Sequence, residues 1–513
     1  MLVHHYLRDS ARQSLGKPAI IIANQAHSFQ EIDEASDRLA SGLQGLGVRR
    51  GDRVATMLDN SIEMVIALWA TLKAGAVFVP VSPGTKADKL GFLLADSEAA
   101  ALIASTDFGQ RVEDATTRVS FDGVTIWVGD KIEATGASLS EILARPRRPP
   151  ADPGLIDQDL CLIIYTSGST GSPKGVMMTH RNIYNNVWSI STYLRNQPDD
   201  VILSVLPLSF DYGLFQVLTG ARIGFTVVLE RSFAYPYDVL NRIAQYRVTG
   251  LPGVPTIFAK LLQFAPFEGL ELSSLRYLSN TAAPFPAAHI LALRKLIPQV
   301  TIFSMYGLTE CTRVSFLDPS RLEAKLTSVG RAMPNSETYI LDDQGRRCGP
   351  REIGELVVRG TSVMRGYWRR PNETTSTLRD GDIPGEKILF TGDLFWKDEE
   401  GDLYFVGRRD DVFKCRGEKV SPREVEACLY ELEAVAEVAV VGMPDSTDGM
   451  AIKAYVVPRE GHVISEPMLR QQCLRRLEPL LVPRFFELCT CLPKTESGKI
   501  MTAALRSSLR AAE

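Results

Sequence analysis

The stretch "YTSGSTGSPKGVMMTH", residues 165–180, gathers three glycines and, ahead of its single lysine, five Ser/Thr residues. It begins where an apolar run (160–165) ends, and we expect it to continue as a helix. Glycines allow successive backbone N–H groups to point at one anion, and the hydroxyls add further donors. A flexible surface turn is the alternative, but such a turn rarely follows a buried strand with so many donors. The pattern therefore predicts a loop that binds a polyphosphate.

The residue that follows the lysine separates this loop from the ordinary nucleotide-binding loop. In the ordinary loop, G-x-x-x-x-G-K-[ST], the lysine stands six residues after the first glycine, and a Ser or Thr that holds magnesium follows it. Lys174 also stands six residues after Gly168 but is followed by Gly175. The physical logic is shared, since Gly168, Gly171 and Gly175 would let backbone amides converge on an anion. The sequence thus favours a phosphate loop of another kind.

The N-terminal part of the chain alternates helix and strand patterns. Ser28 and Glu31 form a capping box ahead of an apolar helix face, and Gly47 stands where that helix should end. A strand is predicted at 53–59, a mostly buried helix at 61–76 and another strand at 77–83. Alternation of this kind is typical of parallel sheets covered by helices. We therefore predict an α/β fold whose large N-terminal domain contains stacked sheets.

The chain changes character towards its C-terminal end. Short β segments separated by Gly and Pro predict an antiparallel β subdomain at about 335–407. Beyond it, Ser421, Pro422 and Glu424 predict a capped helix start, followed by strands at 435–444 and 452–458 and a helix near 466–478. We predict two domains, 1–407 and 408–513, the second a small mobile α+β lid. The basic, proline-rich turn at 144–153 is interpreted as a surface linker.

Composition excludes several classes of protein. The 513 residues are 45% hydrophobic and 23% charged, which is typical of a globular protein, and the net charge of −4 gives no sign of nucleic-acid binding. The N-terminus lacks the pattern of a secretory signal, and no apolar run is long enough to span a membrane. Eight cysteines are too few for a disulfide framework, so we expect buried or incidental thiols. These features predict a cytoplasmic protein.

Six segments, in the same order, give the chain a resemblance to a known family. They are "YTSGSTGSPKGV", "SMYGLTE" (304–310), "GELVVRG" with "GYW" (354–368), "FTGDL" (390–394), "GRRDDVFKCRGEKVSPREVE" (407–426) and "PKTESGKI" (493–500). The sequence resembles the AMP-forming adenylate ligases, a superfamily of acyl-CoA synthetases, adenylation enzymes and luciferases. The resemblance covers essentially the whole chain. It implies that the protein activates a carboxylic acid with ATP and Mg²⁺ as an acyl-AMP, releases pyrophosphate, and transfers the acyl group to a thiol.

The resemblance also assigns roles to individual residues. It implies that Thr309 contacts the α-phosphate, that Glu310 carries the magnesium, and that Tyr306, followed by Gly307, stacks on adenine. Asp393 should accept both ribose hydroxyls, a role that suits its charge and short reach, and Arg408 should add a ribose or phosphate contact. Without their motifs these residues would be read as caps, core or turn residues. The expected contacts to the other phosphates are Thr166, Ser167, Gly168, Ser169, Thr170, Gly171 and Lys174.

The C-terminal domain is expected to supply the remaining machinery. By resemblance, Lys499 bridges the substrate carboxylate and the α-phosphate during adenylation only, Asp410 is the hinge of a domain rotation, and Gly417 lines the thiol channel. The family commonly has arginine three residues after this lysine, where this chain has Thr502.

Residues 206–224 should form one wall of the acid pocket, and 279–286, with Ala282, another. By resemblance, Asp211 aligns with the aspartate that binds the α-amino group in amino-acid-activating members. A buried carboxylate facing the pocket would be costly unless a cation met it. A small amino acid is therefore one expected substrate, and a fatty or aryl acid is the alternative, in which Asp211 caps the following helix. Phe210, Tyr212 and Phe285 either narrow the pocket or belong to the core.

The thiol acceptor is left open by the sequence. Coenzyme A and the phosphopantetheine arm of a carrier protein are alike at the reacting end. Outside the ligases, the competing interpretations are a phosphotransferase or NTPase, which the missing Lys-Ser/Thr pair disfavours, and a non-catalytic nucleotide-binding protein, which would be expected to lose Lys499, Glu310 or Asp393.

Overall fold

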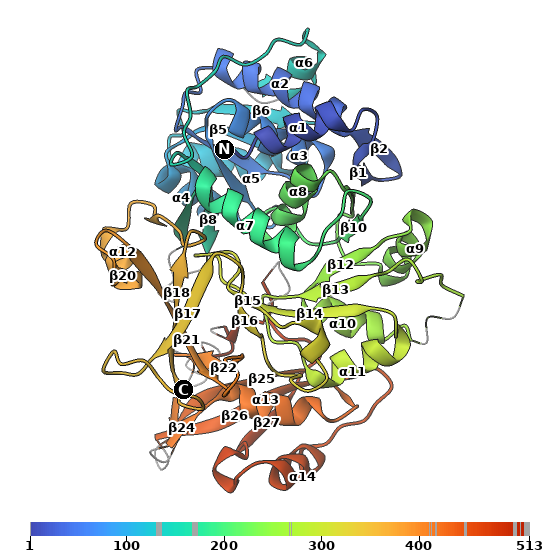
Figure 1. Cartoon of the computed structure of the whole chain (residues 1–513), viewed down its shortest axis with the longest axis vertical. Helices are drawn as coiled ribbons and strands as arrows, with labels where there is room; N and C mark the ends of the chain where they lie inside the picture. The colour runs from blue at the N-terminus through green and yellow to red at the C-terminus, as the bar shows by residue number, and fades with distance from the viewer. Residues whose placement is uncertain are drawn as a thin grey trace.

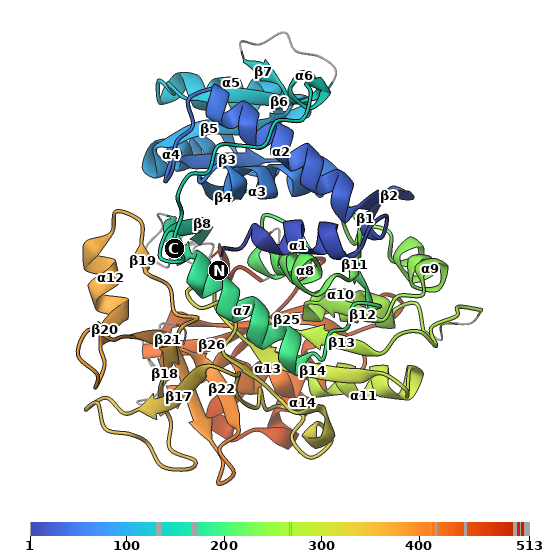
Figure 2. The same ribbon diagram turned by 45° about the horizontal axis from the view of Figure 1, so that its top comes forward.

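The computed structural model confirms the predicted fold class, an α/β protein with a large N-terminal domain and a smaller C-terminal one (Figures 1 and 2). The structure describes the chain except residues 1, 130–135, 167–172, 266, 268, 410, 412, 416–417, 446–448, 496–499, 503 and 507–513. No helix among the described residues is long and apolar enough to cross a membrane.

Eight strands form the first sheet, sheet I, whose central strands are parallel and whose edge strands β9 and β19 are antiparallel. Helices α4 and α5 pack on one face of it through a separate apolar cluster. In spatial order the strands are β19 (Gly366–Tyr367), β9 (Lys174–Thr179), β8 (Leu160–Thr166), β4 (Val77–Val81), β3 (Arg53–Met57), β5 (Ala99–Ser105), β6 (Val124–Val128) and β7 (Ala137–Ser138).

Nine strands form the second sheet, sheet II, which is parallel from β14 to β1 and antiparallel at both edges. In spatial order they are β16 (Arg331–Ala332), β15 (Ser315–Phe316), β14 (Thr301–Tyr306), β13 (Tyr277–Asn280), β12 (Gly250–Gly253), β10 (Val201–Ser204), β11 (Thr226–Leu229), β1 (Pro18–Ile22) and β2 (Gln25–Ser28).

Helices fill the space between the two sheets and cover their outer faces (Figure 2). The predicted capping box is present: the Ser28 hydroxyl accepts from the Glu31 N–H, and the Ser28 N–H donates to the Glu31 carboxylate. The helices of the N-terminal domain are α1 (His5–Gln13), α2 (Phe29–Gly45), α3 (Ile62–Lys73), α4 (Ala87–Ser97), α5 (Gly109–Arg118), α6 (Leu139–Ala144), α7 (His180–Tyr193), α8 (Asp211–Ile223), α9 (Pro236–Tyr246), α10 (Pro255–Leu262), α11 (Ala287–Leu296) and α12 (Pro371–Thr377), with short 3₁₀ turns η1 (Thr106–Phe108) and η2 (Pro319–Arg321).

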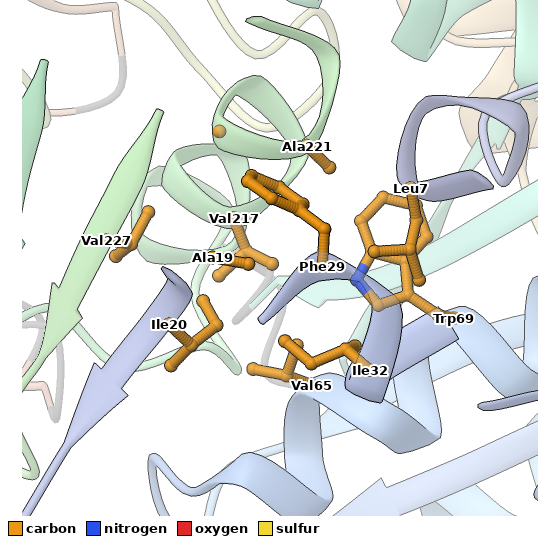
Figure 3. A pocket seen from close by; sticks show the side chains of 11 residues that line it. Leu7, Ala19, Ile20, Phe29, Ile32, Val65, Trp69, Val217, Ala221 and Val227 are labelled. Carbon is orange, nitrogen blue, oxygen red and sulfur yellow. The ribbon is translucent and has the colours of Figure 1, made fainter. Parts of the chain in front are cut away.

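A small apolar cavity marks the point where α1, α2, α3 and α8 meet β1 and β11 (Figure 3). Phe29, Trp69 and Val217 are among the side chains that point into it. Its volume is about 10 Å³, which is at the lower limit for a single water molecule. We therefore interpret it as a packing gap in the core and not as a ligand site.

The region 335–407 contains an antiparallel sheet, sheet III, built from β17 (Ser336–Leu341), β18 (Gly354–Gly360), β20 (Leu378–Asp380), β21 (Lys387–Lys397) and β22 (Leu403–Arg408). The region does not form a separate structural unit. Its strand β19 pairs with β9 and so belongs to sheet I.

The C-terminal domain has the predicted order of elements. It contains β23 (Phe413–Cys415), β24 (Glu418–Val420), α13 (Pro422–Tyr430), β25 (Val435–Asp445), β26 (Gly449–Pro458), α14 (Glu466–Arg476), η3 (Pro479–Leu481) and β27 (Phe485–Leu488). Ser421 does precede α13, but its side chain does not cap the helix. Its hydroxyl instead donates to the Val406 carbonyl of β22, at 2.5 Å, which ties the two domains together.

Two expectations about the glycine-rich stretch are corrected. The segment after the loop is a strand, β9, and helix α7 begins only at His180. Gly175 lies in β9, where an added Cβ would come within 2.8 Å of Ile163 and 3.1 Å of Tyr165, so this glycine serves strand packing and not the loop.

Candidate active site

The predicted phosphate loop connects two paired strands of sheet I. Thr166, the last residue of β8, pairs with Lys174, the first residue of β9, so both ends of the loop are held in register. Ser167, Gly168, Ser169, Thr170 and Gly171 lie outside the described residues. The ammonium group of Lys174 lies 5.5 Å from the ring centroid of Tyr367, which β19 brings alongside β9.

A tight turn at 307–314 carries Thr309 and Glu310, both half-buried. The turn leaves β14 at Tyr306 and returns as β15, and the Val314 N–H donates to the Tyr306 carbonyl at 3.0 Å. Gly307 is required by this geometry, because an added Cβ would lie 2.3 Å from the Thr312 carbonyl oxygen.

The Glu310 carboxylate is held by a residue that the sequence analysis did not single out. The Tyr367 hydroxyl donates to Glu310 Oε1 at 2.7 Å, and the Met364 N–H donates to the Glu310 carbonyl at 2.8 Å. Burial, reinforced by the charge of Glu310, raises the pKa of Tyr367, so the phenol stays a donor. The "GYW" motif contained Tyr367, but nothing in the sequence indicated its partner.

Tyr306, Asp393 and Arg408 come together, as the predicted nucleotide site requires. The Tyr306 hydroxyl donates to Asp393 Oδ2 at 2.5 Å, and Arg408 Nε donates to Asp393 Oδ1 at 3.0 Å. β21 and β22 place Asp393 and Arg408 opposite each other. The Tyr306 ring packs edge-on against Phe395 and stacks at 6.1 Å on Phe405. Asp393 is buried, whereas half of the Arg408 side chain is exposed.

The Glu310 carboxylate and the Asp393–Arg408 pair interact electrostatically. Burial opposes the charge of Arg408, but Asp393 and Glu310 outweigh it and raise the pKa of the guanidinium. Burial and the neighbouring Asp393 likewise raise the pKa of Tyr306. A single half-buried carboxylate fixed by a phenol suits Mg²⁺, which proteins hold by one or two carboxylates together with substrate phosphates. Glu310 therefore fits the ion that the resemblance implies.

Helix α8 covers most of the segment that is expected to form one wall of the acid pocket. Asp211 is its first residue, and Asp211 Oδ1 accepts from the N–H of Tyr212 at 2.8 Å; the half-buried Phe210 precedes it as the N-cap. Burial raises the pKa of Asp211, and the charge of Arg313 opposes that effect. The Tyr212 hydroxyl contacts the carbonyl and the hydroxyl of Ser279 at 2.8 and 2.7 Å.

The segment expected to form the second wall, 279–286, contains one strained residue and one core residue. Ala282 adopts φ +71°, which is uncommon for a residue with a Cβ and is often found at functional sites. Phe285 is buried and stacks on Phe258 at 5.0 Å. Of the two interpretations left open for Phe285, the structure supports the core.

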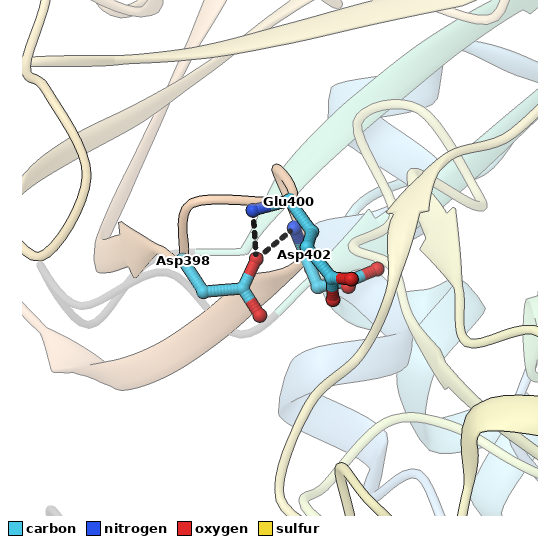
Figure 4. Close-up of side chains that lie close together, drawn as sticks. All are labelled: Asp398, Glu400 and Asp402. Carbon is cyan, nitrogen blue, oxygen red and sulfur yellow. Dashed lines mark hydrogen bonds between the residues drawn. The ribbon is translucent and has the colours of Figure 1, made fainter.

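Three carboxylates at the β21–β22 turn form a second cluster of oxygen ligands, Asp398, Glu400 and Asp402 (Figure 4). The Asp398 carboxylate accepts from the N–H groups of Glu400 and Asp402 at 3.0 and 2.9 Å. Lys325 forms ion pairs with all three, Arg321 with Glu400 and Asp402, and Arg331 with Asp402, so three cations face three carboxylates. The cluster is therefore neutralised by the protein itself and joins the turn to η2.

Lys499, Asp410 and Gly417 lie outside the described residues, but their surroundings are described. Lys494 bridges to Ile500, and Ile500 and Leu505 pack on β25 and β26. On one side of residue 410, Arg409 forms ion pairs with Asp343 and Glu355 of the N-terminal domain. On the other side, Asp411 contacts Arg506 at 2.6 Å.

The paired ends of the predicted phosphate loop in sheet I, the Thr-Glu turn after β14 and the Asp-Arg pair on sheet III are the features that the resemblance to AMP-forming adenylate ligases leads us to expect. Residues 7–368 match the AMP-binding enzyme family, and residues 424–499 match the C-terminal domain of AMP-binding enzymes. The chain belongs to this family.

Relatives match the chain over nearly its whole length. Long-chain-fatty-acid–CoA ligase of Bacillus subtilis (strain 168) is 31% identical over 537 residues, covering 97% of this chain and 93% of its own. Feruloyl-CoA synthase of an Amycolatopsis species is 34% identical over 498 residues, covering 97% and 96%.

Solved structures of CoA ligases and synthetases have the same fold as this chain. An anthranilate CoA ligase in complex with anthranoyl-AMP has a TM-score of 0.91 at 26% identity, covering 100% of this chain and 98% of that chain. o-Succinylbenzoate CoA synthetase of Bacillus subtilis, in complex with its acyl-adenylate intermediate, has a TM-score of 0.86 at 30% identity, covering 98% and 97%. The protein is therefore an AMP-forming acid–thiol ligase, which activates a carboxylic acid as its acyl-AMP and passes the acyl group to a thiol.

Proposed function

We propose that this protein is an acyl-CoA ligase whose adenylation site is formed by Tyr306, Glu310, Asp393 and Arg408. The observation that carries the proposal is the convergence of these residues from three separate chain segments. Tyr306 and Arg408 each contact one carboxylate oxygen of Asp393, and Tyr367 fixes Glu310.

Each of these groups has a part in adenylation. Asp393 accepts the ribose hydroxyls, since each carboxylate oxygen can accept more than one hydrogen bond. Arg408, anchored by its Nε, presents its exposed end to the nucleotide. The Tyr306 ring, supported by Phe405, lies against adenine. Bound Mg²⁺ would neutralise phosphate charge next to Glu310.

The phosphate loop and the C-terminal domain complete the proposed site. Lys174 and the donors from Thr166 to Gly171 hold the β- and γ-phosphates, and Thr309 contacts the α-phosphate. Lys499 offsets the charge that develops as the acid attacks, which lowers the barrier to adenylation only. Asp410 is the pivot about which the C-terminal domain turns to bring Gly417 to the thiol channel.

Coenzyme A is the thiol that we propose. The relatives described above are named as CoA ligases and synthetases. A phosphopantetheinyl carrier protein presents the same reacting thiol and is the second candidate. Incubating the enzyme with ATP, acid and either acceptor, and then measuring the thioester formed, separates the two.

The adenylation half-reaction is tested by acid-dependent exchange of pyrophosphate into ATP and by the nucleotide product. We expect AMP and pyrophosphate; ADP and phosphate would show a phosphotransferase or NTPase instead. Lys499→Ala should abolish exchange but leave transfer from a preformed acyl-AMP to coenzyme A largely intact. Lys494→Ala is the matched control, because Lys494 stands five residues earlier and is paired with Glu437. Equal loss of both half-reactions in Lys499→Ala would refute the role of this lysine.

A further inference from the structure

A buried arginine, Arg313, packs over the ring of Tyr212, the residue that follows Asp211 at the start of α8. Arg313 is only 3% exposed and Asp211 only 4%. The two charges interact: burial raises the pKa of the Asp211 carboxyl, and the positive charge of Arg313 opposes that rise. The guanidinium carbon of Arg313 lies 4.4 Å from the ring centroid of Tyr212, which directly follows Asp211, although no ion pair joins Arg313 to Asp211 among the described residues. A positive and a negative charge are therefore buried near each other at the start of α8.

The protein holds this guanidinium in place by several contacts. Thr312 adopts φ +64°, a strained conformation for a β-branched residue, and its carbonyl accepts from Arg313 Nη1 at 2.7 Å. The guanidinium carbon lies 4.4 Å from the ring centroid of Tyr212, and Ser279 holds the Tyr212 hydroxyl. Arg313 Nε is buried and no described residue accepts from it. Such strain and an unpaired donor are costly in a core and are typical of functional sites.

The position of the pair relates it to the reacting acid. Arg313 follows Glu310 by three residues in the same turn, and both Glu310 and Arg313 act on Asp211. In the proposed function, on which this inference rests, the acid carboxylate meets the α-phosphate beside Glu310. The tail of the acid must then pass the wall that carries Asp211 and Arg313.

The charge of this wall decides which tails it accepts. A wall with Asp211 alone would carry one negative charge and would favour an ammonium group. With Arg313 the wall is neutral, so a tail with either sign of charge would leave an unpaired charge away from water. We propose that Arg313 is a specificity-determining residue, the built-in counter-ion of Asp211, and that it restricts the site to carboxylic acids with uncharged tails.

The test compares acids of one chain length that differ in charge. Hexanoate is uncharged apart from its reacting carboxylate, norleucine adds a cationic ammonium on the α-carbon, and adipate adds an anionic carboxylate at the far end. 3-Phenylpropanoate and phenylalanine repeat the first comparison with a ring. In pyrophosphate exchange, we expect kcat/KM for the uncharged member to exceed that for the charged members at least tenfold. A wild-type enzyme that prefers norleucine or adipate would overturn the inference. An enzyme that exchanges with no acid would instead contradict the proposed function.

Variants of the pair test the counter-ion role directly. Arg313→Met should lower exchange with uncharged acids at least tenfold and shift the preference towards norleucine, whereas Arg313→Lys should keep the wild-type preference. Adding Asp211→Asn to Arg313→Met should recover most of the loss, because the wall is neutral again. A double variant no better than Arg313→Met would refute the pairing.

The isosteric variant Asp211→Asn keeps the test valid if Arg313→Met unfolds, which thermal unfolding would reveal. If Arg313 is the counter-ion, Asp211→Asn leaves a net positive wall and lowers exchange with both norleucine and hexanoate. If Asp211 instead binds a substrate ammonium, Asp211→Asn lowers exchange with norleucine alone, and the inference is wrong.

Discussion

The Tyr367 hydroxyl donates a hydrogen bond to Oε1 of Glu310 at 2.7 Å, although 57 residues separate the two in the sequence. The contact joins β19, an edge strand of sheet I, to the turn that follows β14 of sheet II. It therefore sets the orientation of the carboxylate that we propose for Mg²⁺ before any nucleotide arrives.

Tyr367→Phe removes this hydroxyl and keeps the ring. Groups that orient a metal-binding side chain typically contribute about tenfold or more to metal affinity. We expect the Mg²⁺ concentration for half-maximal pyrophosphate exchange to rise about tenfold, with a smaller change at saturating Mg²⁺. Tyr339→Phe, a change on β17 of sheet III, is the control. An unchanged Mg²⁺ titration would contradict the orienting role.

Asp393→Asn should weaken nucleotide binding. The substitution removes the charge that pairs with Arg408 and the strong acceptor of the Tyr306 hydroxyl, and a hydrogen bond to a charged group contributes about 1.5–3 kcal/mol. The KM for ATP should rise at least tenfold in the exchange assay, while the KM for the acid changes little. Asp343→Asn is the matched control, because Asp343 is exposed and pairs with the neighbouring Arg409. Equal effects of the two substitutions would rule out a specific role for Asp393.

Lys73→Met should destabilise the N-terminal domain without touching the site. The buried Lys73 ammonium contacts Asp33 at 2.7 Å and Asp37 at 2.6 Å. Among the described residues, removing it leaves Arg147 as the one ion-pair partner of two buried carboxylates, and breaking a buried pair in this way costs about 3–5 kcal/mol. Chemical denaturation should show this decrease in the free energy of unfolding. Arg147→Met should cost less, since that side chain is 40% exposed.

His289 should make the packing of the two domains sensitive to acid. Its ring lies on α11, 6.1 Å from the Tyr430 ring of α13, and burial, with the charge of Arg459, lowers its pKa from 6.5 to about 4. The packed arrangement thus binds fewer protons than one with an exposed imidazole. Its contribution is full above pH 6.5 and is lost as the pH falls from 6.5 towards 4.

His289→Leu should therefore flatten the pH dependence of thermal unfolding in this window. We expect the unfolding temperature of the wild type to approach, and then fall below, that of the variant as the pH decreases from 7.5 to 4. Parallel profiles for the two proteins would show that another group controls the acid sensitivity.

Local patterns in the sequence predicted the structure where the partners are close in the chain. The capping box of Ser28 and Glu31 formed as expected, because both hydrogen bonds lie within one helical turn. The same pattern failed at Ser421, whose hydroxyl found a better partner in the carbonyl of Val406 on a strand of the other domain. No local rule could anticipate that contact.

In the candidate site, too, the sequence predicted the residues of known motifs but not the partners that only folding brings together. The motifs predicted Tyr306, Asp393 and Arg408, which the fold brings together. Nothing in the sequence pointed to Arg313, because an arginine after a Thr-Glu motif would ordinarily be solvated. Only the folded turn shows that it is buried against Tyr212.

The ion pairs on either side of residue 410 restrict how the domains can move. Arg409 is fastened to Asp343 and Glu355 on the large body, and Asp411 to Arg506 on the small one. If the C-terminal domain turns as we propose and both sets of ion pairs persist, the torsion angles of a very few bonds must absorb the whole reorientation. A bulky or ring-constrained residue at position 410 would then hold the enzyme in the arrangement that serves only one of the two half-reactions.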